Sequence, residues 1–132
     1  MPTQLTLNFA LYFGTALLAW SLTLLIYMAV TPYAELHLVR QGNRAAAWSL
    51  AGTALGLALP LASLVAHAVS LWDLLSWAAL ALLAQLALWW LARRLLVPDL
   101  RAAIEADREA VGLLLGALSL GLGLLNAASL TY

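Results

Sequence analysis

The chain has 132 residues, of which 65% are hydrophobic and only 9% charged, and its mean hydropathy is +0.96. A soluble domain of this length needs far more charge to cover its surface, so the composition predicts one integral membrane domain over residues 1–132. A net charge of +0 leaves no basic surface for nucleic acid, and the absence of Cys excludes disulfides and thiolate metal sites.

Four apolar runs are long enough to cross a bilayer, because about 20 helical residues at 1.5 Å each span a hydrocarbon core of ~30 Å. They cover residues 8–30, 45–67, 71–92 and 110–131. The opening "MPTQLTLNF" has no Lys or Arg, so it does not read as a secretory signal, and we expect the first run to be retained. The sequence therefore predicts an all-α integral membrane protein with four transmembrane helices.

Basic residues are confined to the two longer loops between these runs. They are Arg40, Arg44, Arg93, Arg94, Arg101 and Arg108. With four spans, both loops fall on the same side of the membrane. Cationic loops resist translocation, so we expect both loops in the cytoplasm and both termini on the outer side.

An internal repeat is visible at an offset of 65 residues, where 42–63 aligns without gaps with 107–128. Each unit consists of a span, a Pro-containing polar loop and a second span, with unit one at 8–67 and unit two at 71–131. Because both units cross the membrane in the same sense, the pattern predicts a parallel duplication with its axis along the membrane normal.

Small residues form stripes along the second and fourth spans. On the second span they are Ala47, Ala51, Ala54, Ala58 and Ala62, with a GxxxG pair at Gly52 and Gly56; on the fourth they are Gly112, Gly116, Ser119, Gly123 and Ala127. In lipid, small residues allow two helices to approach closely. We predict that spans two and four form the centre of the bundle; the alternative is that small residues are simply common in this composition.

Several short motifs match a known family in order along the whole chain. They are "TPYAELHLVRQGNRAAA", "GLALPLAS", "SLWDLLSWA", "QLALWWLARRLLVPDL" and "GLLNAASLTY". The chain resembles the small bacterial inner-membrane proteins of the domain-of-unknown-function 350 group, also called uncharacterised protein family 0719. The resemblance implies a multi-pass protein of the inner (plasma) membrane, with its outer termini in the periplasm.

The same resemblance bears on partners and on one motif. Members often repeat an Asn-x-Ala-Ala segment at the start of the even spans; the first copy is kept here as Asn43, Ala45 and Ala46, and the second has become "DREAVG". Phage-shock-like membrane-remodelling proteins are genomic neighbours of the family, which implies such a cytoplasmic partner. No established activity and no cofactor come with the resemblance.

Polar residues inside the spans are the first place to look for a site, because they are costly to bury in lipid. The candidate intramembrane residues are Pro60, Ser63, His67, Gln85 and Asn126. Pro60 removes the amide that would bond the Gly56 carbonyl and predicts a kink, which either opens a polar pocket or only shapes the bundle. For the two amides, we favour bonds to neighbouring helices over contacts with a ligand or ion.

The loop residues offer a second candidate surface. Arg40, Arg44, Arg101 and Arg108 could contact a cytoplasmic partner or anionic lipid, or could be ordinary topology charge. We expect a short helix that ends near Gly42, and an amphipathic stem at 99–110 that extends span four.

No catalytic, cofactor-binding or metal-binding motif is recognisable, so we expect no enzyme. Three hypotheses remain: an anchor or scaffold for envelope-stress or membrane-remodelling partners, an oligomeric small channel or transporter, and a purely structural module. A single copy has few intramembrane polar groups, so transport requires a homo-oligomer with the small stripes at its axis.

Overall fold

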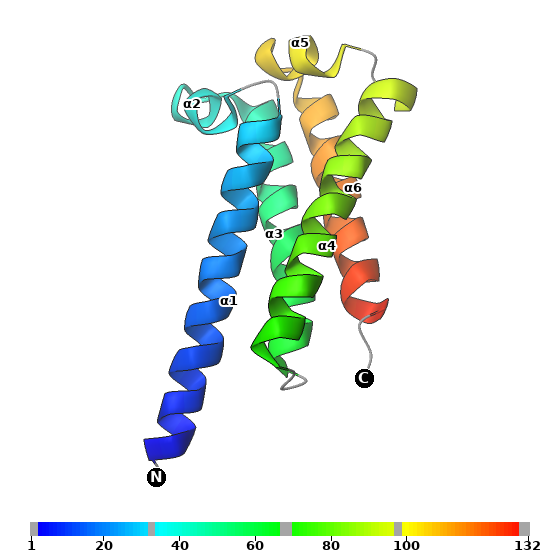
Figure 1. Ribbon diagram of the computed structural model, residues 1–132. Coiled ribbons are helices and arrows are strands. Elements are labelled where there is room, and N and C mark those ends of the chain that lie inside the picture. Colours follow the sequence, from blue (N-terminus) through cyan, green and yellow to red (C-terminus); the bar gives the residue numbers. More distant parts are fainter. Residues whose placement is uncertain (1–2, 32–33, 67–69, 97–98, 130–132) are drawn as a thin grey trace.

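The computed structural model describes residues 3–31, 34–66, 70–96 and 99–129, and within these ranges every regular element is a helix (Figure 1). The elements are α1 (Thr3–Val30), α2 (Glu35–Arg40), α3 (Arg44–Ala66), α4 (Leu71–Leu91), the π-helical turn η1 (Ala92–Leu96), α5 (Leu100–Glu105) and α6 (Glu109–Ser129). Four helices in this part of the chain are long and apolar enough to cross a membrane. The predicted all-α membrane fold with four spans is confirmed.

Two boundaries differ from the prediction. The first helix begins at Thr3 rather than at Asn8, and a bond of 3.1 Å from Gln4 Nε2 to Asn8 Oδ1 joins neighbouring turns of this added segment. The third span does not end at Ala92, because helical structure continues through η1 to Leu96.

The predicted stem at 99–110 is wrong, because α5 is a separate helix that turns back from α6. The turn is closed by backbone bonds of 2.9 Å from Ala106 N to Ala102 O and 3.0 Å from Arg108 N to Ala103 O. On α5, Leu100, Ala103 and Ile104 are buried. The apolar face of this short segment gains more by folding onto the bundle than by continuing α6 into water.

The long helices form a bundle with two short helices at one end. Figure 1 shows α2 and α5 together at that end, and the Thr3 end of α1 and the Ser129 end of α6 at the other. Helix α1 leans away from the bundle toward its Thr3 end, and its buried residues, Ala19, Thr23 and Tyr27, all lie in its second half.

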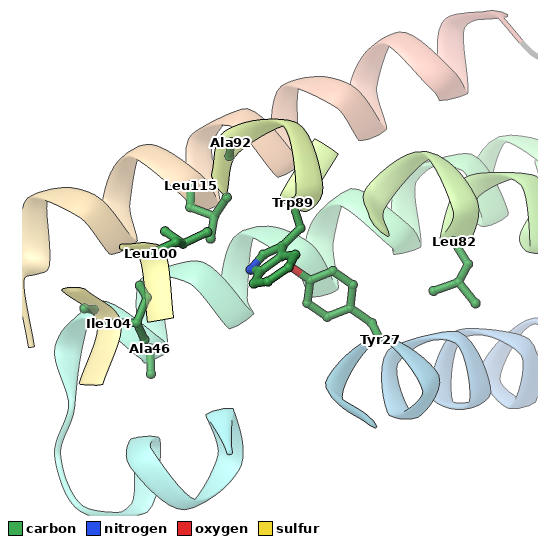
Figure 2. Close-up of a cluster of buried hydrophobic side chains, with 9 residues drawn as sticks. Tyr27, Ala46, Leu82, Trp89, Ala92, Leu100, Ile104 and Leu115 are labelled. Carbon is green, nitrogen blue, oxygen red and sulfur yellow. The ribbon is translucent and has the colours of Figure 1, made fainter. Parts of the chain in front are cut away.

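The core beside the short helices joins every part of the fold (Figure 2). Tyr27 of α1 is fully buried in one cluster with Trp89 of α4, together with Leu100 of α5 and Leu115 of α6. This cluster attaches the short helices to the spans. A second cluster, around Leu64 and Leu74, fills the opposite half of the bundle.

Candidate functional site

Helices α3 and α6 make direct backbone contact through their glycines. A Cβ atom added at five of them would clash with backbone of the facing helix; these are Gly52, Gly56, Gly112, Gly116 and Gly123. The contacts join Gly52 to Gly116, Gly112 to Ala45, Gly116 to Trp48, and Gly123 to Gly56. Such an approach suits Cα–H···O contacts and is the packing that small residues permit in lipid. The closest helix pair is thus the one for which the sequence predicts a close approach.

The alanine stripe on span two does not form the centre of this contact, although Ala51 borders a cavity beside Gly116. None of Ala47, Ala51, Ala54, Ala58 and Ala62 is among the buried residues of α3. The face of α3 toward α6 instead carries Ala45, Gly52 and Gly56, because glycine brings the two backbones closer than alanine does. The alanines Ala54, Ala58 and Ala62 lie toward α1, where Trp20 Nε1 donates to the Ala54 carbonyl at 2.8 Å.

Gln85 links three helices in the middle of the bundle. Its Nε2 donates to the Ser119 carbonyl of α6 at 2.9 Å, and a Cβ at Gly56 of α3 would lie only 2.6 Å from the same nitrogen. Thr53 Oγ1 lies 3.4 Å from Ser119 Oγ. All of these side chains are buried; Ser49 Oγ and Gln85 Oε1 have no hydrogen-bond partner among the described residues.

The other residues of the predicted polar site are not gathered around Gln85. Pro60 is buried within α3, Ser63 Oγ donates to the Ala127 carbonyl at 3.2 Å, and Asn126 is half-buried on α6. His67 lies outside the described residues. Pro60 and Asn126 line neither the groove between α1 and α3 nor the smaller cavities beside Leu100 and beside Gly52.

At the α2–α5 end of the bundle, two polar side chains, Asn43 and Asp107, bond free backbone groups at the ends of α5 and α3. Asn43 Nδ2 donates to the Ile104 carbonyl at the end of α5, and its Oδ1 accepts from Ala46 N, both at 2.8 Å. Asp107 Oδ1 accepts from Ala45 N at 2.9 Å, which satisfies a free amide in the first turn of α3. These two side chains fasten α5 and the turn after it to the start of α3.

The turns that end α2 and α5 have the same geometry. Gly42 N bonds the Val39 carbonyl and Asp107 N bonds the Ile104 carbonyl, each at 3.0 Å. Both residues have a positive φ, 86° at Gly42 and 58° at Asp107. Each pair of equivalent positions is separated by 65 residues, the offset of the repeat in the sequence.

Both short helices present arginines to the surroundings. Arg40, Arg44, Arg101 and Arg108 are all exposed. Arg44 lies 3.9 Å from Glu109, and Arg101 lies 3.5 Å from Glu105. Arg40 and Arg108 have no ion pair with any described residue, so their guanidinium groups are available to a partner.

One acidic residue behaves differently from the other loop charges. Glu35 is only 1% exposed, and burial raises the pKa of its carboxyl to about 7, although a bond of 2.9 Å from Thr31 Oγ1 acts in the opposite direction. Its Oε2 has no hydrogen-bond partner among the described residues. The sequence contains an indication that Glu35 is buried, because Leu38 and Val39 lie three and four positions after it, on the same helix face. No group of three potential metal ligands occurs in the described part of the chain.

Comparison with known proteins agrees with this architecture. The profile of the family described as "Domain of Unknown Function (DUF350)" matches residues 1–130. The chain is 36% identical over 126 residues to "UPF0719 inner membrane protein YjfL" of Escherichia coli (strain K12), covering 96% of this chain and 95% of the relative. The protein of the same description from Escherichia coli O157:H7 matches equally. No solved structure matches significantly.

Neither description names an activity, a ligand or a partner. The relative's description and the four apolar helices together identify a multi-pass protein of the inner membrane. With nearly the whole chain matched, the protein belongs to the DUF350 family of inner-membrane proteins, in which the relatives are described as UPF0719.

Proposed function

We propose that the protein is a non-catalytic membrane scaffold, with α2, α5 and the adjoining arginines forming a cytoplasmic platform that recruits a partner. The observation that carries this proposal is the pair of side-chain caps from Asn43 and Asp107. They hold α5 and the turn after it against the start of α3, and Leu38 and Val39 of α2 pack against the same core. The four arginines of the platform remain exposed. A surface whose helices are capped and packed against the bundle suits docking, because less conformational entropy is lost on binding.

The platform carries exposed acidic residues as well as arginines, and its two arginines without an ion pair in the described part of the chain are the groups that suit an acidic partner. Arg40 and Arg108 come from different halves of the chain, and neither has an intramolecular ion pair among the described residues. Guanidinium groups suit bidentate contacts with carboxylates. A phage-shock-like protein of membrane remodelling is the partner that the family's genomic neighbours suggest.

A parallel duplication accounts for the two equivalent parts of the platform, which are α2 with the turn after it and α5 with the turn after it. We propose repeat units at 8–67 and 71–131 within a single membrane domain. The equivalent turns at Gly42 and Asp107 and the starts of α2 and α5, at Glu35 and Leu100, support the offset of 65.

Co-purification after crosslinking in intact cells tests the scaffold. The variant has Gln in place of Arg40, Arg44, Arg101 and Arg108, and it keeps Arg93 and Arg94 to preserve orientation. We expect it to lose the cytoplasmic partner, whereas Asn126→Leu, a change within α6, should retain it. If Asn126→Leu lost the partner and the variant with four Gln residues retained it, a role for the platform would be excluded.

The second candidate is a small oligomeric channel with a polar path near Pro60 and Asn126. It is favoured by the buried Ser49 Oγ and Gln85 Oε1, which lack partners among the described residues. However, the glycines expected at the axis of an oligomer already pack within one chain, so a homo-oligomer needs a different face. Ion flux into liposomes that is lost with Asn126→Leu would support the channel.

A further inference from the structure

A long apolar groove separates α1 from α3 in the half of the bundle away from α2 and α5. Its volume is about 570 Å³. Ala58, Ala62 and Ala66 of α3 line it, at a spacing of four residues that places small side chains on one helix face. The aromatic side of the groove comes from α1, where Phe9 and Phe13 stack with ring centroids 5.5 Å apart.

The lining selects for hydrocarbon. Tyr12 and Trp20 are the only lining residues with polar side-chain atoms, and Trp20 Nε1 already donates to the Ala54 carbonyl at 2.8 Å. That bond ties α1 to α3 at the end of the groove nearest the middle of the bundle. A polar ligand placed here would lose its hydrogen bonds to water without replacement.

The length of the groove suits one apolar occupant. Phe9 and Trp20 are 11 residues apart, which is about 16 Å along a helix at 1.5 Å per residue and close to half of a ~30 Å hydrocarbon core. An apolar lining over this length fits an alkyl chain about one leaflet long, and a helix from a second copy is the competing occupant that crosslinking distinguishes.

We propose that one acyl chain of a membrane phospholipid occupies this groove, with its headgroup near Phe9 and its terminal methyl group against Trp20. The acyl chain completes the packing of α1, in which no described residue before Ala19 is buried. The proposal also gives a role to Ala58 and Ala62, which do not form the contact with α6.

Photo-crosslinking in liposomes tests the site. The probe is phosphatidylcholine with a diazirine on one acyl chain, and the adducts are mapped by peptide mass spectrometry. We expect adducts concentrated on the groove residues of α1 and α3. The variant Ala62→Phe fills the groove, and its adducts should fall to the level at lipid-facing positions. The matched control Ala79→Phe makes the same change at an exposed position of α4 and should keep the wild-type pattern.

Native mass spectrometry gives a second readout. Wild-type protein in mild detergent should retain one phospholipid per chain, and Ala62→Phe should lose it with unchanged helical circular dichroism. The smaller Ala62→Leu serves if the phenylalanine variant does not fold. Adducts spread evenly over all lipid-facing helices would overturn the proposal, and so would a crosslink between the grooves of two copies.

Discussion

Glu35 belongs to the core although it lies in a polar loop of the sequence. Its side chain is almost fully buried at the start of α2, and one carboxylate oxygen has no partner among the described residues. Burial without a countercharge penalises the ionised form, so the folded protein holds the proton up to a pKa of about 7 against an ordinary 4.5. The residue therefore couples the attachment of α2 to pH.

The sign of this coupling follows from the raised pKa. The folded state binds the proton more tightly than the unfolded state, so stability is highest below pH 4.5, falls as pH rises toward about 7, and is constant above that value. We expect Glu35→Gln to remove this dependence and to stabilise the protein at pH 8, by up to about 3 kcal/mol. Unfolding in mild detergent at pH 5 and pH 8 measures it. Glu105→Gln, at an exposed position, is the control and should keep the wild-type slope.

The glycines of the α3–α6 contact can be tested one at a time. In Gly52→Ala the added methyl group meets the backbone of Gly116, which cannot rotate away, so we expect a loss of about 1–3 kcal/mol. Gly121→Ala is the matched control on α6, because nothing lies within 4 Å of its added methyl group. It should be neutral or slightly stabilising through helix propensity. Equal unfolding midpoints for both variants would contradict the contact.

At the scale of elements, Asp107 contributes both a cap and a turn. Its carboxylate accepts from Ala45 N, and its φ of 58° is a conformation that Asp and Asn tolerate better than most residues. We expect Asp107→Ala to lose about 0.5–2 kcal/mol as the cap of α3 disappears, and Asp107→Asn to retain most of the stability.

Hydrogen exchange at the amide of Ala45 reports on this cap directly. The amide should exchange faster in Asp107→Ala and stay protected in Asp107→Asn, which keeps a side-chain oxygen. If the Asn variant exchanges as fast as the Ala variant, the negative charge at the helix start matters more than the accepted hydrogen bond.

The helices were predictable to different degrees, for physical reasons. The four spans follow from apolar length, and the end of α2 follows from Gly42, which adopts a φ of 86° without the steric cost of a side chain. Helix α5 was missed because its periodicity is continuous with that of α6. The break lies at Asp107, where capping α3, a contact between residues 62 positions apart, favours the turn. A pattern confined to neighbouring residues does not contain that contact.

The candidate site was also predictable only in part. The glycines of α6 recur along one face and so indicate its contact with another helix, but α3 carries two stripes of small residues on different faces. Only the neighbouring helices decide that Gly52 and Gly56 face α6 while Ala58 and Ala62 face α1. Gln85 was found as a buried amide, yet its partner Ser119 could not be inferred without the bundle.

At the scale of the whole molecule, α2 and α5 share one end of the bundle, and the four arginines of the platform gather there. Moving an arginine through hydrocarbon costs about 2.5–3.5 kcal/mol on insertion scales, so the end that carries them should remain in the cytoplasm. The scaffold proposal depends on this orientation, because a cytoplasmic partner reaches only that face.

The chain has no Cys, so single introduced cysteines can report the orientation without a background. Thr3→Cys and Leu71→Cys mark one end of the bundle, and Gln41→Cys and Ala102→Cys mark the other; all four positions are exposed. With a membrane-impermeant maleimide on intact spheroplasts, we expect labelling of the first pair at once and of the second pair only after permeabilisation. The reverse pattern would place the arginines outside and remove the platform from the cytoplasm. Labelling of Gln41→Cys and Ala102→Cys from opposite sides would separate α2 from α5, and the shared platform and the parallel duplication would both fail.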